Sequence, residues 1–163
     1  KDWKKNNIET DVYFIVAIAG ANGIDRVEVS RKIKKEGLKP IFAIHPTSYI
    51  AASAQVSEEC QILTNVTIVA RVFIGRNTIV NTMASIDHEC ILGEGVHIGP
   101  GATLAGCIEV GDYSFIGANT TILPRIKIGK NVIIGAGSVV TKDIPDNVTA
   151  LGSPCRIVNK RII

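Results

Sequence analysis

The residues of this chain that could do chemistry gather in the stretch VNTMASIDHECILGEGVHIGPG, at positions 80–101. Asp87, His88 and Glu89 place an imidazole between two carboxylates, and His97 follows nine residues later. Imidazole titrates near neutral pH, and an acidic neighbour can orient it or increase its basicity. We therefore expect His88 to act as a general base with Glu89 beside it. The alternative, a solvated surface histidine, is disfavoured by the clustered charges and the second histidine.

A six-residue repeat must position these side chains. An apolar residue stands at every sixth place, and a small or β-branched residue follows four places later in each hexad. Two inward positions and a turn per six residues describe one side of a triangular coil, and three hexads close it. The sequence thus predicts a mainly β protein, a parallel β-helix of about five coils. The leading apolar positions are Ile50, Val56, Ile62, Ile68, Ile74, Val80, Ile86, Leu92, Ile98, Leu104, Val110, Ile116, Ile122, Ile128, Ile134 and Val140.

The corners of this coil have their own composition. Glycine follows the leading residue in seven hexads, and Asn or Gly stands three places after it in seven. Corners need left-handed dihedral angles or close backbone approach, which these residues tolerate. Asp87-His88-Glu89 replaces that pattern, whereas Ile86 and Cys90 keep the inward pattern. The repeat is therefore interrupted only on its outer surface, which favours a functional site at this corner.

Two segments flank the repeat. Residues 12–45 read as strand, helix and strand, with the helix ending at Gly37 and a Gly20–Gly23 loop after the first strand. We assign 1–45 to a partial β-α-β, Rossmann-like segment in which Trp3 is a packing residue. Residues 46–144 form the β-helix. Residues 145–163 form a closing loop and a basic tail containing Arg156, Lys160 and Arg161.

Composition narrows the function classes. The net charge of +3 is small and scattered, which argues against a nucleic-acid partner. No signal peptide or 18-residue apolar run is present, so we expect a cytoplasmic protein without a membrane segment. Four cysteines form no CxxC pair, and Cys60 and Cys90 occupy inward positions, as reduced structural cysteines do. Cys90 is taken as the thiol nearest to His88, and because it points inward we expect direct transfer without an acyl-enzyme.

Three further stretches extend this picture: FAIHPTSYIAASAQV where the coil begins, NTMASIDHECILGEGVHIGPGATLAG at the site, and IIGAGSVVTKDIPDNVTALGSPCRIV at the end. With them, residues 12–158 resemble the hexapeptide acyltransferases, and within these the sialic acid O-acetyltransferases and the bacillosamine- and perosamine-type N-acetyltransferases. The resemblance implies a left-handed coil, acetyl-CoA as acetyl donor, no metal, and a sugar or nucleotide-sugar acceptor in surface glycan biosynthesis. It also implies a homotrimer with sites between subunits.

The same resemblance assigns roles to residues. His88 is the proton acceptor and Glu89 increases its basicity, while Asn81 orients the site. Relatives begin with a Gly-rich strand and turn that this chain lacks, so the loop at Gly20 is the last part of the sugar-binding unit. The acetyl-CoA groove is lined by His97, Gly106, Ala118 and Ala136. The Gly106 N–H is our candidate for stabilising the oxyanion.

Two other functions stay open at this stage. A γ-type carbonic anhydrase shares the coil but needs three histidines around zinc. The chain has only His45, His88 and His97, and His45 lies at the mouth of the coil. A non-catalytic β-helix scaffold is the second alternative. Whether the acceptor is an amine or a hydroxyl is not decided by the residues.

Overall fold

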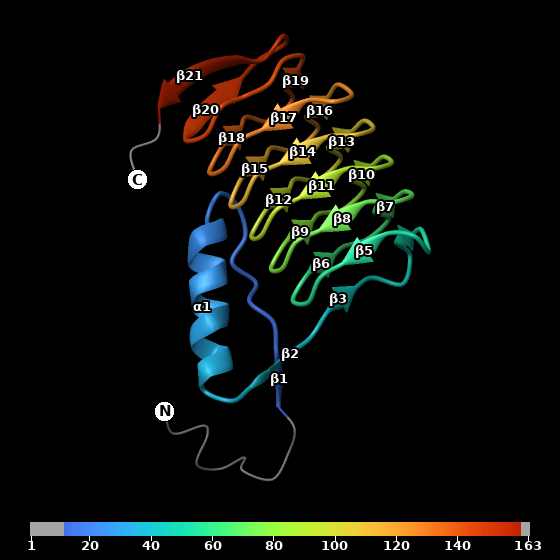
Figure 1. Cartoon of the computed structure of the whole chain (residues 1–163), viewed down its shortest axis with the longest axis vertical. Helices are drawn as coiled ribbons and strands as arrows, with labels where there is room; N and C mark the ends of the chain where they lie inside the picture. The colour runs from blue at the N-terminus through green and yellow to red at the C-terminus, as the bar shows by residue number, and fades with distance from the viewer. Residues whose placement is uncertain (1–11, 161–163) are drawn as a thin grey trace.

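The computed structural model describes residues 12–160 of the 163-residue chain. A tall stack of coils carries the helix Gly23–Lys35 alongside it (Figure 1). The predicted packing residue Trp3 and the basic residue Arg161 lie outside the described residues.

Three parallel sheets form the sides of the coil. Sheet 1 has the order β19-β16-β13-β10-β7-β4, sheet 2 the order β17-β14-β11-β8-β5, and sheet 3 runs from β18 through β15, β12, β9 and β6 to β3. With six coil strands in two of its sheets, the β-helix makes between five and six turns, so the predicted fold is confirmed. The strands are β3 (Ala43–Ile44), β4 (Tyr49–Ile50), β5 (Gln55–Val56), β6 (Gln61–Ile62), β7 (Thr67–Ile68), β8 (Phe73–Ile74), β9 (Ile79–Val80), β10 (Ser85–Ile86), β11 (Ile91–Leu92), β12 (His97–Ile98), β13 (Thr103–Leu104), β14 (Glu109–Val110), β15 (Phe115–Ile116), β16 (Thr121–Ile122), β17 (Lys127–Ile128), β18 (Ile133–Ile134) and β19 (Val139–Val140).

The hexad repeat places its apolar residues inside the coil. Ile86 pairs with Ile68 on one neighbouring coil and with Leu104 on the other, and all three side chains are fully buried. Each residue therefore stacks on the one 18 positions away, as three hexads per coil require. Aliphatic ladders of this kind remove apolar surface from water along the whole length of the coil.

The corners show both left-handed dihedral angles and close backbone approach, as expected from their composition. In the hexads led by Val56 through Ile134, the third residue after the leading aliphatic has a positive φ, such as 55° at Asn65 and 60° at Glu89. The glycines one place after the aliphatic are packed against the next coil instead. A Cβ on Gly75 would lie 2.5 Å from the carbonyl carbon of Gly93, so only glycine fits there.

The N-terminal unit consists of β1 (Tyr13–Phe14), α1 (Gly23–Lys35) and β2 (Lys39–Pro40), with β1 and β2 parallel. Both predicted apolar strands are much shorter than expected. The second predicted strand is divided into β2 and β3. β3 already pairs with β6 in sheet 3, just before the start of the β-helix expected at position 46. The coil thus includes residues that the sequence pattern grouped with the β-α-β unit.

Arg26 of α1 holds the helix against the coil. Its fully buried guanidinium donates from Nε to the Asn77 carbonyl oxygen and from Nη2 to the Gly95 carbonyl oxygen, each at 2.7 Å. Burial lowers the Arg26 pKa to about 10, which still leaves the group charged at neutral pH. The helix is consequently fixed on the corner that carries residues 77 and 95.

Two further strands extend sheet 3 after the last hexad. β20 (Val148–Leu151) adds to β18 in sheet 3, and β21 (Arg156–Lys160) folds back antiparallel to it. No helix in residues 12–160 is long and apolar enough to cross a membrane.

Candidate active site

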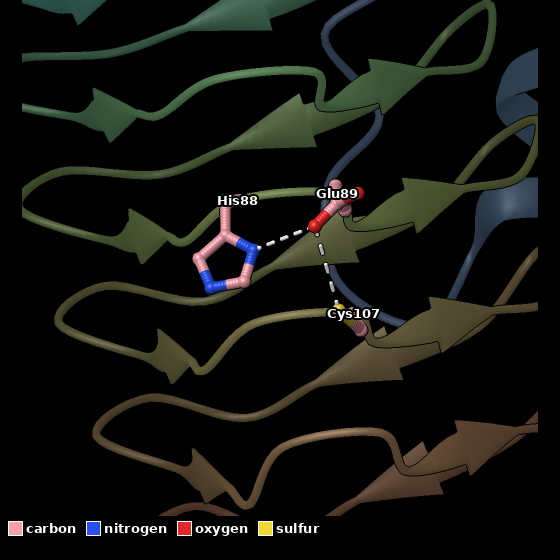
Figure 2. A group of neighbouring side chains, drawn as sticks. All are labelled: His88, Glu89 and Cys107. Carbon is pink, nitrogen blue, oxygen red and sulfur yellow. Dashed lines mark hydrogen bonds and ion pairs between the residues drawn. The ribbon is translucent and has the colours of Figure 1, made fainter.

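The His88 and Glu89 side chains form a hydrogen-bonded pair on the corner after β10 (Figure 2). His88 Nδ1 lies 3.0 Å from Glu89 Oε2, and both side chains are exposed. Hydrogen bonding to His88, with a further contribution from the Arg71 charge, lowers the pKa of Glu89 below its usual value. An ionised Glu89 accepts the Nδ1 proton, so His88 Nε2 is left as the proton acceptor.

The coil backbone fixes the position of this pair. Asp87 Oδ1 accepts the His88 N–H at 2.7 Å, and the His88 carbonyl oxygen accepts the Cys107 N–H at 2.8 Å. Asp87 thus supports the corner rather than the imidazole ring. On the other side, Arg71 Nη2 contacts Glu89 Oε1 at 3.2 Å. Arg71, Glu89 and Cys107 occupy the same corner position on three successive coils.

Gly106 lies beneath the His88 ring. A Cβ at Gly106 would be 2.5 Å from His88 Nε2 and 2.6 Å from Cε1. Gly106 was expected to line the acetyl-CoA groove, and in the structure the His88 imidazole makes the close approach to it. Gly106 therefore allows the ring to rest on the backbone of the next coil.

The expectation that Cys90 is the thiol nearest the site was wrong. Cys90 is fully buried, its Sγ donates to the Ala105 carbonyl oxygen at 3.1 Å, and burial raises its pKa to about 11. Cys107 is the thiol at the site, with Sγ 3.8 Å from Glu89 Oε2 (Figure 2). Cys107 lies beside the His88–Glu89 pair because it is 18 residues, one full turn, from Glu89. Cys90, only two residues from His88, points into the coil instead.

A second group of predicted residues surrounds His97 on sheet 3. The Gly20 N–H donates to His97 Nδ1 at 2.8 Å, and Asn81 Nδ2 lies 3.4 Å from Nε2. The Phe115 ring meets the imidazole edge-on at 5.2 Å between centroids. Asn81 and Gly20 thus both contact His97, the buried histidine, rather than the exposed imidazole of His88, in the described part of the chain.

The last two predicted residues, Ala118 and Ala136, stack on a different corner. The Gly137 N–H donates to the Ala118 carbonyl oxygen at 2.8 Å, which places them on adjacent coils. Their corner adjoins one edge of sheet 1, and the corner with His88 and Gly106 adjoins the other. One chain therefore keeps the two halves of the predicted groove apart.

The burial of His97 gives a testable pH dependence. Burial, followed by the Arg26 charge, lowers its pKa from 6.5 to about 4. The unfolded chain then binds more protons than the folded one between these values, so stability falls as the pH is lowered from 6.5 to 4. The expected loss is about 3 kcal/mol. Urea unfolding of His97→Asn across this range should show a flatter profile than the parent, and an identical profile would contradict the assignment.

Metal chemistry of the carbonic anhydrase type has no support in this geometry. His45 is exposed and its Nδ1 contacts Thr47 Oγ1 at 2.9 Å, at the start of the coil. In the described part of the chain, the one group of three possible metal-binding side chains is His88, Glu89 and Cys107, which contains a single histidine.

Comparison with known proteins agrees with the coil. The family model "Bacterial transferase hexapeptide (six repeats)" matches residues 71–106 and 107–142. A structure of PerB from Caulobacter crescentus in complex with CoA and GDP-perosamine superposes with a TM-score of 0.88 at 36% identity, covering 91% of this chain and 70% of that one. The chain belongs to the hexapeptide-repeat sugar acetyltransferase family. The predicted relationship and the left-handed β-helix are confirmed.

Two further relatives of this family are similar. The acetyltransferase domain of PglB from Neisseria gonorrhoeae FA1090, in complex with acetyl coenzyme A, has a TM-score of 0.83 at 32% identity, covering 86% of this chain and 68% of that one. GDP-perosamine N-acetyltransferase of Escherichia coli O157:H7 is 35% identical over 103 residues, 63% of this chain. The match spans 46% of that curated relative, less than half its length.

Sequence reasoning missed two residues of the site, Arg71 and Cys107. The signal was present in the repeat, since both lie 18 positions from Glu89. Their position in the coil, rather than their neighbourhood along the chain, places them beside the His88–Glu89 pair.

Proposed function

We propose that this chain transfers the acetyl group of acetyl-CoA to the amine of a nucleotide-linked amino sugar. The observation that carries the proposal is the His88–Glu89 pair, whose geometry leaves Nε2 of an exposed imidazole as a proton acceptor. The relatives with CoA, acetyl coenzyme A and GDP-perosamine in their crystals support both substrates. The perosamine relatives favour an amine over a hydroxyl acceptor.

The proposed reaction is a direct transfer. The amine attacks the thioester carbonyl, His88 Nε2 takes the amine proton, and the C–S bond breaks as the C–N bond forms. The proton then passes to the departing CoA thiolate, so no group on the protein is acetylated. Proton transfer by a positioned base contributes about 10²–10⁴-fold, and holding donor and acceptor together contributes further.

We also propose that the site is completed by a second copy of the chain, in a homotrimer. From β7 to β16, sheet 1 presents small outward side chains, Thr67, Ser85, Thr103 and Thr121, that permit close packing around a threefold axis. Such packing brings the Ala118–Ala136 corner of one copy to the His88–Gly106 corner of the next. The exposed Met83 and Leu123 stand at the two edges where the copies would meet.

Mixed oligomers test this placement. Since the two corners come from different copies, His88→Ala and Ala136→Trp should each lower transfer at least a hundredfold when expressed alone. Co-expressed in equal amounts, they should regain about a quarter of the sites, because each mixed trimer contains one interface with both native corners. Activity in Ala136→Trp alone, or no recovery on mixing, would contradict an intersubunit site.

A smaller substitution tests the position of the imidazole. Gly106→Ala introduces a methyl group where the His88 ring now rests, so the ring must swing away from its place. We expect a fall in turnover of at least tenfold with little change in melting temperature, because the exposed ring can move without disturbing the core. Gly137→Ala is unsuitable as a control, because the backbone φ of 68° at Gly137 would strain an alanine there. Ala105→Gly, next in the chain, is the better control and should keep turnover within a fewfold range.

We place the chain in the cytoplasm, where acetyl-CoA and reduced thiols occur together. The four cysteines are all free, consistent with a reducing compartment.

Isothermal titration with acetyl-CoA separates the proposed transferase function from a scaffold role. The enzyme should bind acetyl-CoA, and a chain that binds neither acetyl-CoA nor CoA would be a scaffold.

A further inference from the structure

We propose that His88, Glu89 and Cys107 form a binding site for Zn²⁺, and that the metal inhibits rather than supports acetyl transfer. The binding site follows from the side chains alone. Its inhibitory effect rests on the function proposed above.

The donor atoms have the chemistry and spacing that zinc requires. One imidazole nitrogen, one carboxylate oxygen and one sulfur lie within 4.8 Å of one another. Tetrahedral zinc with bonds of about 2.0–2.3 Å holds its ligand atoms roughly 3.3–3.8 Å apart. His88 Nδ1 and Glu89 Oε2 are 3.0 Å apart, and Glu89 Oε2 and Cys107 Sγ are 3.8 Å apart. Small side-chain movements suffice to bring all three onto one ion.

The surroundings hold these donors in place and leave access for an ion. The Cys107 N–H donates to the His88 carbonyl oxygen, so the two coils that supply the ligands are fixed to each other. Arg71 contacts Oε1 of Glu89, which leaves Oε2 facing the other two donors. His88 and Glu89 are exposed and Cys107 is half-buried, so water can supply the fourth ligand. A sulfur and an imidazole together favour zinc or cobalt over magnesium or calcium.

A metal on Nδ1 would change the state of the proposed base. Glu89 now accepts the Nδ1 proton, which leaves Nε2 unprotonated. With Zn²⁺ on Nδ1, the neutral ring must carry its proton on Nε2 instead. Nε2 can then no longer accept a proton from the amine, so transfer stops without displacement of either substrate.

Cobalt(II) is the probe for the binding site, because a thiolate on Co²⁺ gives a charge-transfer absorption band. The full chain, free of any tag, should bind one Co²⁺ per chain with this band, and Zn²⁺ should displace it. Cys107→Ser should lose the band and bind Zn²⁺ at least tenfold more weakly by isothermal titration. Cys155→Ser, a buried cysteine elsewhere, and His45→Ala, the other exposed histidine, should both behave as the parent.

The outcomes separate this proposal from the proposed function. A parent without the charge-transfer band, or a Cys107→Ser variant that keeps it, would overturn the zinc site whatever the activity. If binding is found, Zn²⁺ should inhibit the parent at concentrations at least tenfold lower than those that inhibit Cys107→Ser. Equal inhibition of the two would show that the metal acts elsewhere, and would overturn the inhibitory role. A parent that binds metal but has no transferase activity would contradict only the proposed function.

Discussion

Replacing His88 with alanine is expected to lower acetyl transfer by about 10²–10⁴-fold, the range typical of a general base. The side chain is exposed, rests on Gly106 and contributes nothing to the inner ladders of the coil. The melting temperature and the affinity for acetyl-CoA should therefore stay close to those of the parent. Initial rates of CoA release at saturating acetyl-CoA measure the effect directly.

His45→Ala is the matched control for this substitution. His45 is also exposed, but it lies at the start of the β-helix, where its imidazole contacts Thr47 of its own loop. Its loss should leave the rate within about twofold of the parent, as for other exposed side chains outside a site. A His88→Ala variant that kept near-parental turnover would remove His88 as the base.

The second large effect is expected at Ile86, directly inside the corner that presents His88. Its side chain is fully buried between Ile68 and Leu104. Ile86→Asp would place a carboxylate in the dry interior without a partner, which costs roughly several kcal/mol. Chemical denaturation should show a protein that is largely unfolded or strongly destabilised, and activity should fall with it.

Ile91→Asp provides the same substitution on the outside of the coil. Ile91 is the outward residue of β11 and is 50% exposed, so a carboxylate there stays hydrated. The change in unfolding free energy should stay within about 0.5 kcal/mol. Equal destabilisation by the two substitutions would mean that the inward register is wrong.

The coil could be predicted in detail because its information is local and repeated. A leading aliphatic such as Ile86 and a small inward residue such as Cys90 define the inner surface within six residues. Sixteen consistent hexads then leave little freedom in register, and the observed pairing of Ile86 with Leu104 follows from counting. The Asp87-His88-Glu89 corner was visible for the same reason, since it breaks a regular pattern only on the outer surface.

The parts that escaped prediction depend on contacts between coils or between units. Cys107 contacts Glu89 because one turn of the coil takes 18 residues, and residues adjacent in the sequence do not reveal that contact. His97 is buried because the Gly20 loop is held over it by a helix anchored through Arg26. The brevity of β1 has a similar origin. The backbone after it is bound by side chains of the coil instead of extending a sheet, as where Gln61 Nε2 donates to the Val16 carbonyl oxygen.

The most direct test of the account is a product analysis of acetyl transfer. The chain would be incubated with acetyl-CoA and a panel of nucleotide-linked 4-amino sugars, including GDP-perosamine, with sialic acids as hydroxyl acceptors. Mass spectrometry would follow both the sugar and the intact protein while free CoA thiol is titrated. Direct transfer predicts CoA release that requires an amino sugar, equals the N-acetylated product in amount, and leaves the protein unmodified. Acceptor-independent release with an acetyl group on Cys107, or no transfer to any acceptor by a chain that binds acetyl-CoA, would contradict it.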